Sequence, residues 1–187
     1  MPFETMRTFF ALAALAANAA TIVLLIIGLA GRREDKSPFG FISGATMWLA
    51  GGVALAATLG SLYLSEIVHL IPCKYCWFQR IAMYPIALIL LIAAARKDAR
   101  ARLYAGTLAV IGAVIATWHR LIQAYPSLDS GACDASGPPC SAPYIKEFGF
   151  VTIPYMALSA FLLILVLLWA DRINSEFLES TPASVSD

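Results

Sequence analysis

The chain has 187 residues, of which 60% are hydrophobic and only 13% are charged, and its formal net charge is +1. Soluble domains are about 45–50% apolar and about 25% charged, so this composition excludes an ordinary soluble protein and favours a membrane protein. The balanced charge, without a basic stripe, also argues against a nucleic-acid partner.

Five apolar runs are long enough to cross a membrane as helices. A spanning helix needs roughly 20 mostly apolar residues, and lipid forces the backbone polar groups to pair within the segment. In chain order the predicted spans cover residues 8–30, 45–71, 76–95, 103–124 and 148–170. The sequence therefore predicts an all-α integral membrane protein with five spans.

The first apolar run has a second interpretation as a secretory signal peptide. Its roughly 23 residues exceed the roughly 7–15 of a signal-peptide core, and the basic segment 32–36 follows it like a stop-transfer flank. We therefore expect an uncleaved N-terminal helix with a cytoplasmic loop over residues 1–44. A helical bundle over 45–170 and a polar, disordered cytoplasmic tail over 171–187 are expected to follow.

Lysine and arginine are distributed unevenly between the two sides that these spans define. They are enriched in the 31–44 loop, in the 96–102 loop (RKDARAR) and in the C-terminal tail. Because loops rich in Lys and Arg stay in the cytoplasm, the 72–76 and 125–147 loops are predicted to face outward.

Four cysteines form two pairs, one in each outward-facing loop. Cys73 and Cys76 form a CKYC motif at the start of the third span, and Cys133 and Cys140 lie in the polar 125–147 loop. Two spans separate these loops, so both pairs lie on the same side of the membrane whichever way the chain is oriented. The charge bias makes that side extracytoplasmic, where disulfides persist.

Three interpretations of these cysteines are open from the residues alone. Two inert disulfides would suit a structural scaffold, and four thiolates could bind zinc or copper in a non-enzymatic membrane protein. We favour a redox relay and predict no metal site, because a CxxC pair at a helix N-terminus gains a stabilised thiolate from the helix dipole. The second pair then supplies the partner for thiol–disulfide exchange.

Polar residues near the outer ends of two spans could hold the carbonyls of a quinone. Arg80 lies four residues after Cys76 on the same helical face, where its guanidinium would stabilise a thiolate and polarise a bound oxygen. His119 and Gln123 share a face of the fourth span at a similar depth. Trp77 is either an interfacial aromatic or a wall for a flat ring. Arg80 and His119 could instead reach lipid head groups.

At these residues the sequence resembles a known family. The strings LGSLYLSEI, PCKYCWFQRIAMYP, WHRLIQAYP and PCSAPYIKEFGFVTIPYMAL resemble the DsbB/BdbC disulfide bond formation proteins, over about residues 55–170. All four cysteines are included in order, and the short spacing of the second pair is closest to the BdbC-type branch. Residues 1–44 have no counterpart in the family's basic four-helix pattern.

The resemblance implies a four-helix redox bundle with one additional N-terminal transmembrane helix, in a prokaryotic cell (inner) membrane. It implies that Cys76 meets a quinone, ubiquinone or menaquinone, with help from Arg80, and that His119 lies near that quinone. Cys133 and Cys140 would reoxidise a DsbA/BdbD-like thioredoxin-fold partner, with Cys133 forming the mixed disulfide. The implied activity is that of a quinone-dependent protein-disulfide oxidoreductase, which supports disulfide formation in exported proteins.

A VKOR-like quinone reductase is the nearest alternative enzyme, because it uses a similar bundle. In that family the loop pair precedes the CxxC in the sequence, whereas here Cys73 and Cys76 come first. The order favours the DsbB/BdbC type. A thiol metal-binding membrane protein without enzymatic activity is the alternative from another class.

Overall fold

The computed structural model describes residues 3–31, 39–42, 44–129, 133 and 138–180. The predicted basic flank at 32–36 and the last part of the predicted tail, 181–187, lie outside the described residues. The long helices are α1 (Phe3–Ala30), α2 (Thr46–Leu62), α3 (Lys74–Arg96), α4 (Ala101–Ala124) and α5 (Ile153–Ser180). Short turns of helix are η2 (Gly40–Ile42), η3 (Tyr63–Ile67) and η4 (Pro126–Leu128).

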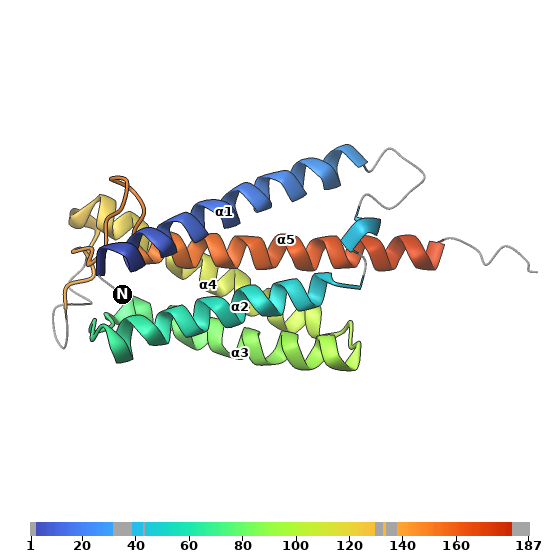
Figure 1. The fold of residues 1–187 in the computed structure, drawn as a ribbon, viewed down its shortest axis with the longest axis horizontal. Coiled ribbons are helices and arrows are strands. Elements are labelled where there is room, and N and C mark those ends of the chain that lie inside the picture. Colours follow the sequence, from blue (N-terminus) through green and yellow to red (C-terminus); the bar gives the residue numbers. More distant parts are fainter. Residues whose placement is uncertain (1–2, 32–38, 43, 130–132, 134–137, 181–187) are drawn as a thin grey trace, which may run out of the picture.

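Among the described residues, five helices are long and apolar enough to cross a membrane, which confirms the predicted all-α architecture. Helices α2 to α5 form a closed four-helix bundle, because α2 packs against α3 and α5, and α4 also packs against α3 and α5. Helix α1 lies outside this ring and packs along α5 (Figure 1). The bundle therefore has the expected four-helix core with one additional helix on its surface.

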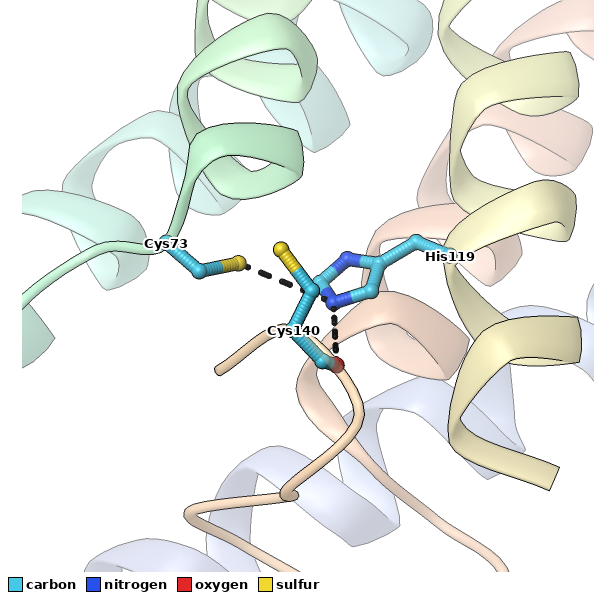
Figure 2. Close-up of side chains that lie close together, drawn as sticks. All are labelled: Cys73, His119 and Cys140. Carbon is cyan, nitrogen blue, oxygen red and sulfur yellow. Dashed lines mark hydrogen bonds between the residues drawn. The ribbon is translucent and has the colours of Figure 1, made fainter. Parts of the chain in front are cut away.

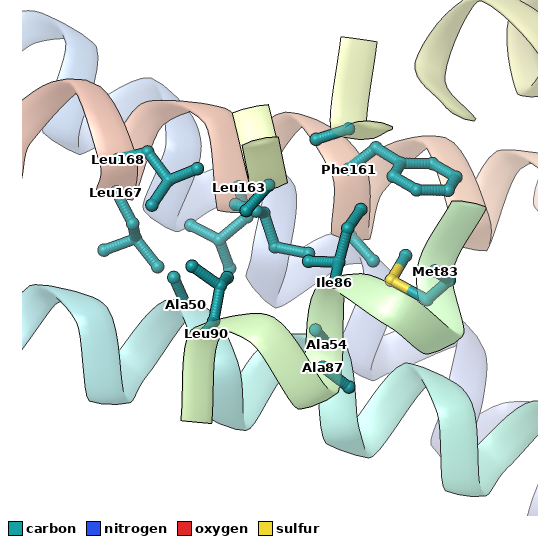
Figure 3. Packing of buried hydrophobic residues seen from close by; sticks show 14 of the residues in the cluster. Ala50, Ala54, Met83, Ile86, Ala87, Leu90, Phe161, Leu163, Leu167 and Leu168 are labelled. Carbon is teal, nitrogen blue, oxygen red and sulfur yellow. The ribbon is translucent and has the colours of Figure 1, made fainter. Parts of the chain in front are cut away.

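The core of the bundle is packed from small residues and a few large ones. One buried cluster contains Ala50 and Ala54 of α2, Ile86 and Leu90 of α3, and the fully buried Phe161 of α5 (Figure 3). Small residues allow close helix contact in membranes, where no hydrophobic effect drives helices together.

The second and fifth helices are shorter than the apolar runs predicted at the ends that lie nearest the cysteines. The second predicted span extended to 71, but regular structure stops at Ile67, and His69 has a left-handed backbone with φ of 60°. The fifth was expected to begin at 148, where Phe148 and Gly149 instead form a turn with positive φ. Hydropathy does not predict where these helices end, because the apolar runs continue through residues whose positive φ is incompatible with a helix.

The C-terminal end of α5 corrects the predicted start of the tail. We expected a disordered tail from Asp171 onward, but α5 continues to Ser180. Asp171 lies 3.0 Å from Nη1 of Arg102 on α4 and accepts a hydrogen bond from Thr46 on α2. These contacts to two neighbouring helices keep the polar end of α5 helical.

We expect the substitution Gly112→Ala in α4 to destabilise the bundle. A Cβ at this position would lie 2.2 Å from the ring of Phe161, and overpacking of this kind costs about 1–3 kcal/mol. Gly52→Ala in α2 is the matched control, because its Cβ would have no neighbour within 4 Å. Thermal unfolding of the purified protein in detergent should show a lower Tm for Gly112→Ala only. Equal Tm values for the two variants would contradict the packing described here.

Candidate active site

The two cysteine pairs meet at the end of the bundle where α3 begins and α4 ends. Cys133 and Cys140 are joined by a disulfide, whereas Cys73 and Cys76 are free thiols with sulfurs 3.0 Å apart. Cys73 precedes α3 with an extended backbone, and its carbonyl accepts a hydrogen bond from the amide of Trp77. This capping position places both thiols at the helix N-terminus, as the CKYC motif predicted.

His119 connects the two pairs. Its Nε2 lies 3.6 Å from the sulfur of Cys73 and 3.2 Å from the carbonyl oxygen of Cys140 (Figure 2). The sulfurs of Cys73 and Cys140 and a ring nitrogen of His119 all lie within 4.8 Å of one another. Thiolate attack on a disulfide requires such an approach, so the arrangement brings the pairs within reach of exchange.

Gln79 sets the orientation of the His119 ring. Its side-chain nitrogen lies 3.2 Å from Nδ1 of His119, and both side chains are buried. Because the Gln79 amide donates to Nδ1, the neutral ring carries its proton on Nε2, which faces Cys73 and Cys140. Tyr75 packs beside this ring and accepts a hydrogen bond from the indole of Trp118.

Cys73 is the thiol that these contacts favour as a thiolate. The hydrogen bond from Cys76 lowers the pKa of Cys73 from 9.0 to about 4; burial opposes this shift, and the hydrogen bond from His119 adds to it. Cys73 therefore stays charged at neutral pH and loses its charge only as the pH falls through about 4. A charged Cys73 is both a nucleophile and a good leaving group in thiol–disulfide exchange.

Arg80 and Cys76 also line a cavity of about 550 Å³ beside the CxxC motif. Nε and Nη2 of Arg80 donate to the hydroxyl and the carbonyl oxygen of Ser61, each at 2.9 Å. The guanidinium also lies 5.3 Å from the ring of Trp77. Only 9% of Arg80 is exposed, so the residue is fixed within the bundle rather than extended toward lipid head groups.

The lining of this cavity suits a flat, mostly apolar molecule with a few oxygens. Its polar residues gather around Cys76, Arg80 and Ser61, and most of the remaining wall is aliphatic or aromatic. Ligand pockets typically have volumes of about 300–1,000 Å³ and few polar groups. The residues present therefore fit a quinone, with Arg80 as the donor toward a carbonyl oxygen.

The predicted site residues divide into two groups in space. Cys76 and Arg80 line the cavity, and Trp77 stacks on Arg80 without lining it. His119 lies among the cysteines instead, and Gln123 is also absent from the lining. The buried Oε1 of Gln123 has no hydrogen-bond partner among the described residues.

Sequence reasoning missed two residues of this site, Gln79 and Ser61. Gln79 lies three residues after Cys76, so helical spacing could have placed it on the same face as Cys76. Ser61 is 19 residues from Arg80 in the chain, and its role depends on how α2 packs against α3. Local patterns carry no signal for such a contact.

The cluster of Cys73, His119 and Cys140 also has the spacing of a metal site. A cysteine binds a metal as a thiolate, and the sulfur of Cys140 is bonded to Cys133. Structural zinc sites have four ligands, and this group has three among the described residues. The geometry agrees better with exchange between sulfurs than with a metal centre.

We expect the acid shift of Cys73 to depend on His119. In a Cys133→Ala/Cys140→Ala background, where Cys73 and Cys76 are the remaining thiols, ultraviolet absorbance should detect a thiolate down to a pH of about 4. Adding His119→Ala should move the titration midpoint upward, because a stabilising donor is lost. Gln123→Ala is the control and should leave the midpoint unchanged. An identical midpoint with and without His119 would contradict the proposed contact.

Comparison with known proteins identifies the family of the chain. The family model "Disulfide bond formation protein DsbB" matches residues 43–170. Disulfide bond formation protein C of Bacillus subtilis is 52% identical over 114 residues, which are 61% of this chain and 83% of the relative. A probable disulfide formation protein C of Bacillus cereus is 44% identical over 134 residues, covering 72% of this chain and 92% of the relative. No solved structure matches significantly. The chain is therefore a multi-pass membrane protein that belongs to the DsbB family of disulfide bond formation proteins.

Proposed function

We propose that this protein reoxidises a DsbA-like thioredoxin-fold partner outside the cytoplasm and passes the electrons to a membrane quinone. The observation that carries the proposal is the approach of Cys73 and Cys140, whose sulfurs lie within 4.8 Å of each other beside His119. This approach links a disulfide in a loop to a dithiol that borders an apolar cavity. Electrons can thus move from a water-exposed partner to an acceptor in the membrane.

The first step is attack by a partner thiolate on the Cys133–Cys140 disulfide. Attack at Cys133 forms the mixed disulfide and releases Cys140 as a thiolate. Cys140 is the cysteine of this pair that lies beside Cys73 and His119. Attack at Cys133 therefore releases the sulfur that attacks Cys73 in the second step. His119, with its proton on Nε2, can stabilise the charge as it forms.

The second step transfers the disulfide between the pairs. The Cys140 thiolate attacks Cys73 of the oxidised CxxC pair, forms a Cys73–Cys140 disulfide and releases Cys76. The partner's second thiolate then attacks the mixed disulfide, so the partner leaves with its own disulfide and Cys133 is freed as a thiolate. Cys133 attacks Cys140, which re-forms the loop disulfide and releases Cys73. The lowered pKa of Cys73 makes it a good leaving group here. The result is a closed loop disulfide beside two free thiols, which is the redox state described above.

The last step returns Cys73 and Cys76 to the disulfide. A bound quinone would supply an acceptor for two electrons and two protons. Cys76 and Arg80 both line the cavity, where the positive charge of Arg80 would polarise a carbonyl oxygen. The sulfurs of Cys73 and Cys76 are 3.0 Å apart, so their disulfide can close without a large movement of the backbone.

We expect Cys76→Ser to abolish partner-dependent quinone reduction and Arg80→Ala to slow it by roughly 100-fold, as loss of a charge-stabilising donor does elsewhere. Arg96→Ala, at the opposite end of α3 and exposed, is the matched control and should keep full activity. The assay follows the absorbance of ubiquinone and menaquinone analogues with a reduced thioredoxin-fold protein. The proposal is wrong if folded wild-type protein reduces neither class of quinone with several such partners.

We also expect a direct disulfide between Cys73 and Cys140. The double variant Cys76→Ala/Cys133→Ala retains only these two cysteines and should oxidise to an intramolecular disulfide, which peptide mass spectrometry can identify. In the matched variant Cys73→Ala/Cys133→Ala, the remaining Cys76 and Cys140 should pair far less, because Cys76 faces the cavity. Equal yields would exclude the proposed order of exchange.

A further inference from the structure

The cavity beside Cys76 and Arg80 extends beyond the family's four-helix bundle onto α1. Its wall includes Ala13, Ala17 and Ala20 of α1, opposite Val53 and Ala57 of α2. The family model matches residues 43–170, so α1 lies outside the matched region. This protein therefore builds part of the cavity from a helix that the shared family pattern does not include.

Helix α1 is held in place by polar and apolar contacts. Near its middle, Nδ2 of Asn18 donates to the hydroxyls of Tyr155 and Ser159 on α5, each at 2.9 Å. Near its outer end, Nε of Arg7 lies 2.5 Å from Glu147. Because α1 is anchored to α5 and to the loop before α5, its alanines form a fixed wall of the cavity.

Phe10 of α1 packs its ring against Gly60 of α2. A Cβ at Gly60 of α2 would lie 2.9 Å from the ring of Phe10, so the ring packs directly over this glycine. After Phe10, the residues of α1 that line the cavity are all alanines. The small side chains leave space between the helices where larger ones would fill it.

We propose that α1 and α2 hold the isoprenoid tail of the quinone whose ring is bound beside Cys76 and Arg80. This inference rests on the proposed function. The cavity is polar around Arg80 and apolar toward Ala17 and Ala20, which matches a molecule with a carbonyl-bearing ring and a hydrocarbon chain.

The size of the cavity supports a ligand larger than a ring. A cavity of about 150 Å³ holds a benzene molecule, so a volume of about 550 Å³ accommodates a ring and a further stretch of chain. A phospholipid is less suitable, because its charged head group would have to be desolvated beside Arg80, which is only 9% exposed. An uncharged ring avoids that penalty.

The test compares the binding of two quinones that have the same ring, one with an isoprenoid tail and one without. One such pair has a naphthoquinone ring and the other has a benzoquinone ring. Ala17→Leu/Ala20→Leu fills the wall formed by α1, and Ala57→Leu fills the opposite wall from α2. Ala19→Leu is the matched control, because Ala19 is exposed on α1 and does not line the cavity. Dissociation constants come from quenching of tryptophan fluorescence in the full-length protein in detergent, and Tm reports folding.

We expect each cavity-filling variant to lose about tenfold or more in affinity for the tailed quinone, as removal of about two buried methylene contacts would cause. Affinity for the tail-less ring should stay unchanged, and Ala19→Leu should match wild type for both. Unchanged affinity for the tailed quinone in a folded variant would overturn the inference, as would an equal loss for both quinones. Tail-independent binding with co-purified phospholipid would also overturn it, by assigning the space to lipid.

The same binding measurements distinguish failure of the proposed function from failure of the role proposed for α1. If wild-type protein binds neither the tailed nor the tail-less quinone, the quinone site itself is wrong. If wild-type protein binds the ring equally well with and without the tail, the quinone site stands and only the role of α1 is wrong.

Discussion

The contact of His119 with Cys73 and Cys140 is the constraint on which the active site depends. A fully buried imidazole must satisfy both ring nitrogens, and His119 does so through Gln79 on one side and Cys140 on the other. These bonds attach the loop after α4 to the start of α3. The loop disulfide thus lies against the CxxC pair without a covalent link between them, which leaves both pairs free to exchange.

The site separates two chemical environments across a single turn of helix. Cys73 lies among polar groups that stabilise its thiolate, whereas Cys76 borders an apolar cavity with a fixed guanidinium. Ser61 holds Arg80 inside the bundle, so a buried charge retains hydrogen bonds while it faces the cavity. In the proposed function, Cys73 would take part in exchange between sulfurs, and Cys76 would pass electrons to a membrane acceptor in the cavity.

Helix α1 adds to this arrangement without altering the bundle. Its hydrogen bonds from Asn18 to α5 provide the directional contact that apolar packing in lipid lacks. The ring formed by α2 to α5 is complete without it, yet the cavity is not. In the proposal, the additional helix would contact the ligand, and the cysteine chemistry would remain within the four-helix bundle.

The sequence by itself determined the number and type of the spans, because lipid requires about 20 apolar residues in a helix and tolerates few alternatives. It also placed Cys76 and Arg80 on one face and both cysteine pairs on one side, since helical spacing and the parity of spans need no tertiary information. Only the tertiary structure decided that His119 joins the cysteines rather than the cavity, and that Ser61 holds Arg80. The tertiary structure also decided that α5 continues past Asp171. The charge of Asp171 marks the end of the apolar run in the sequence, but an ion pair with Arg102 compensates it. Such contacts join residues far apart in the chain, so they depend on how the helices pack and leave no local pattern in the sequence.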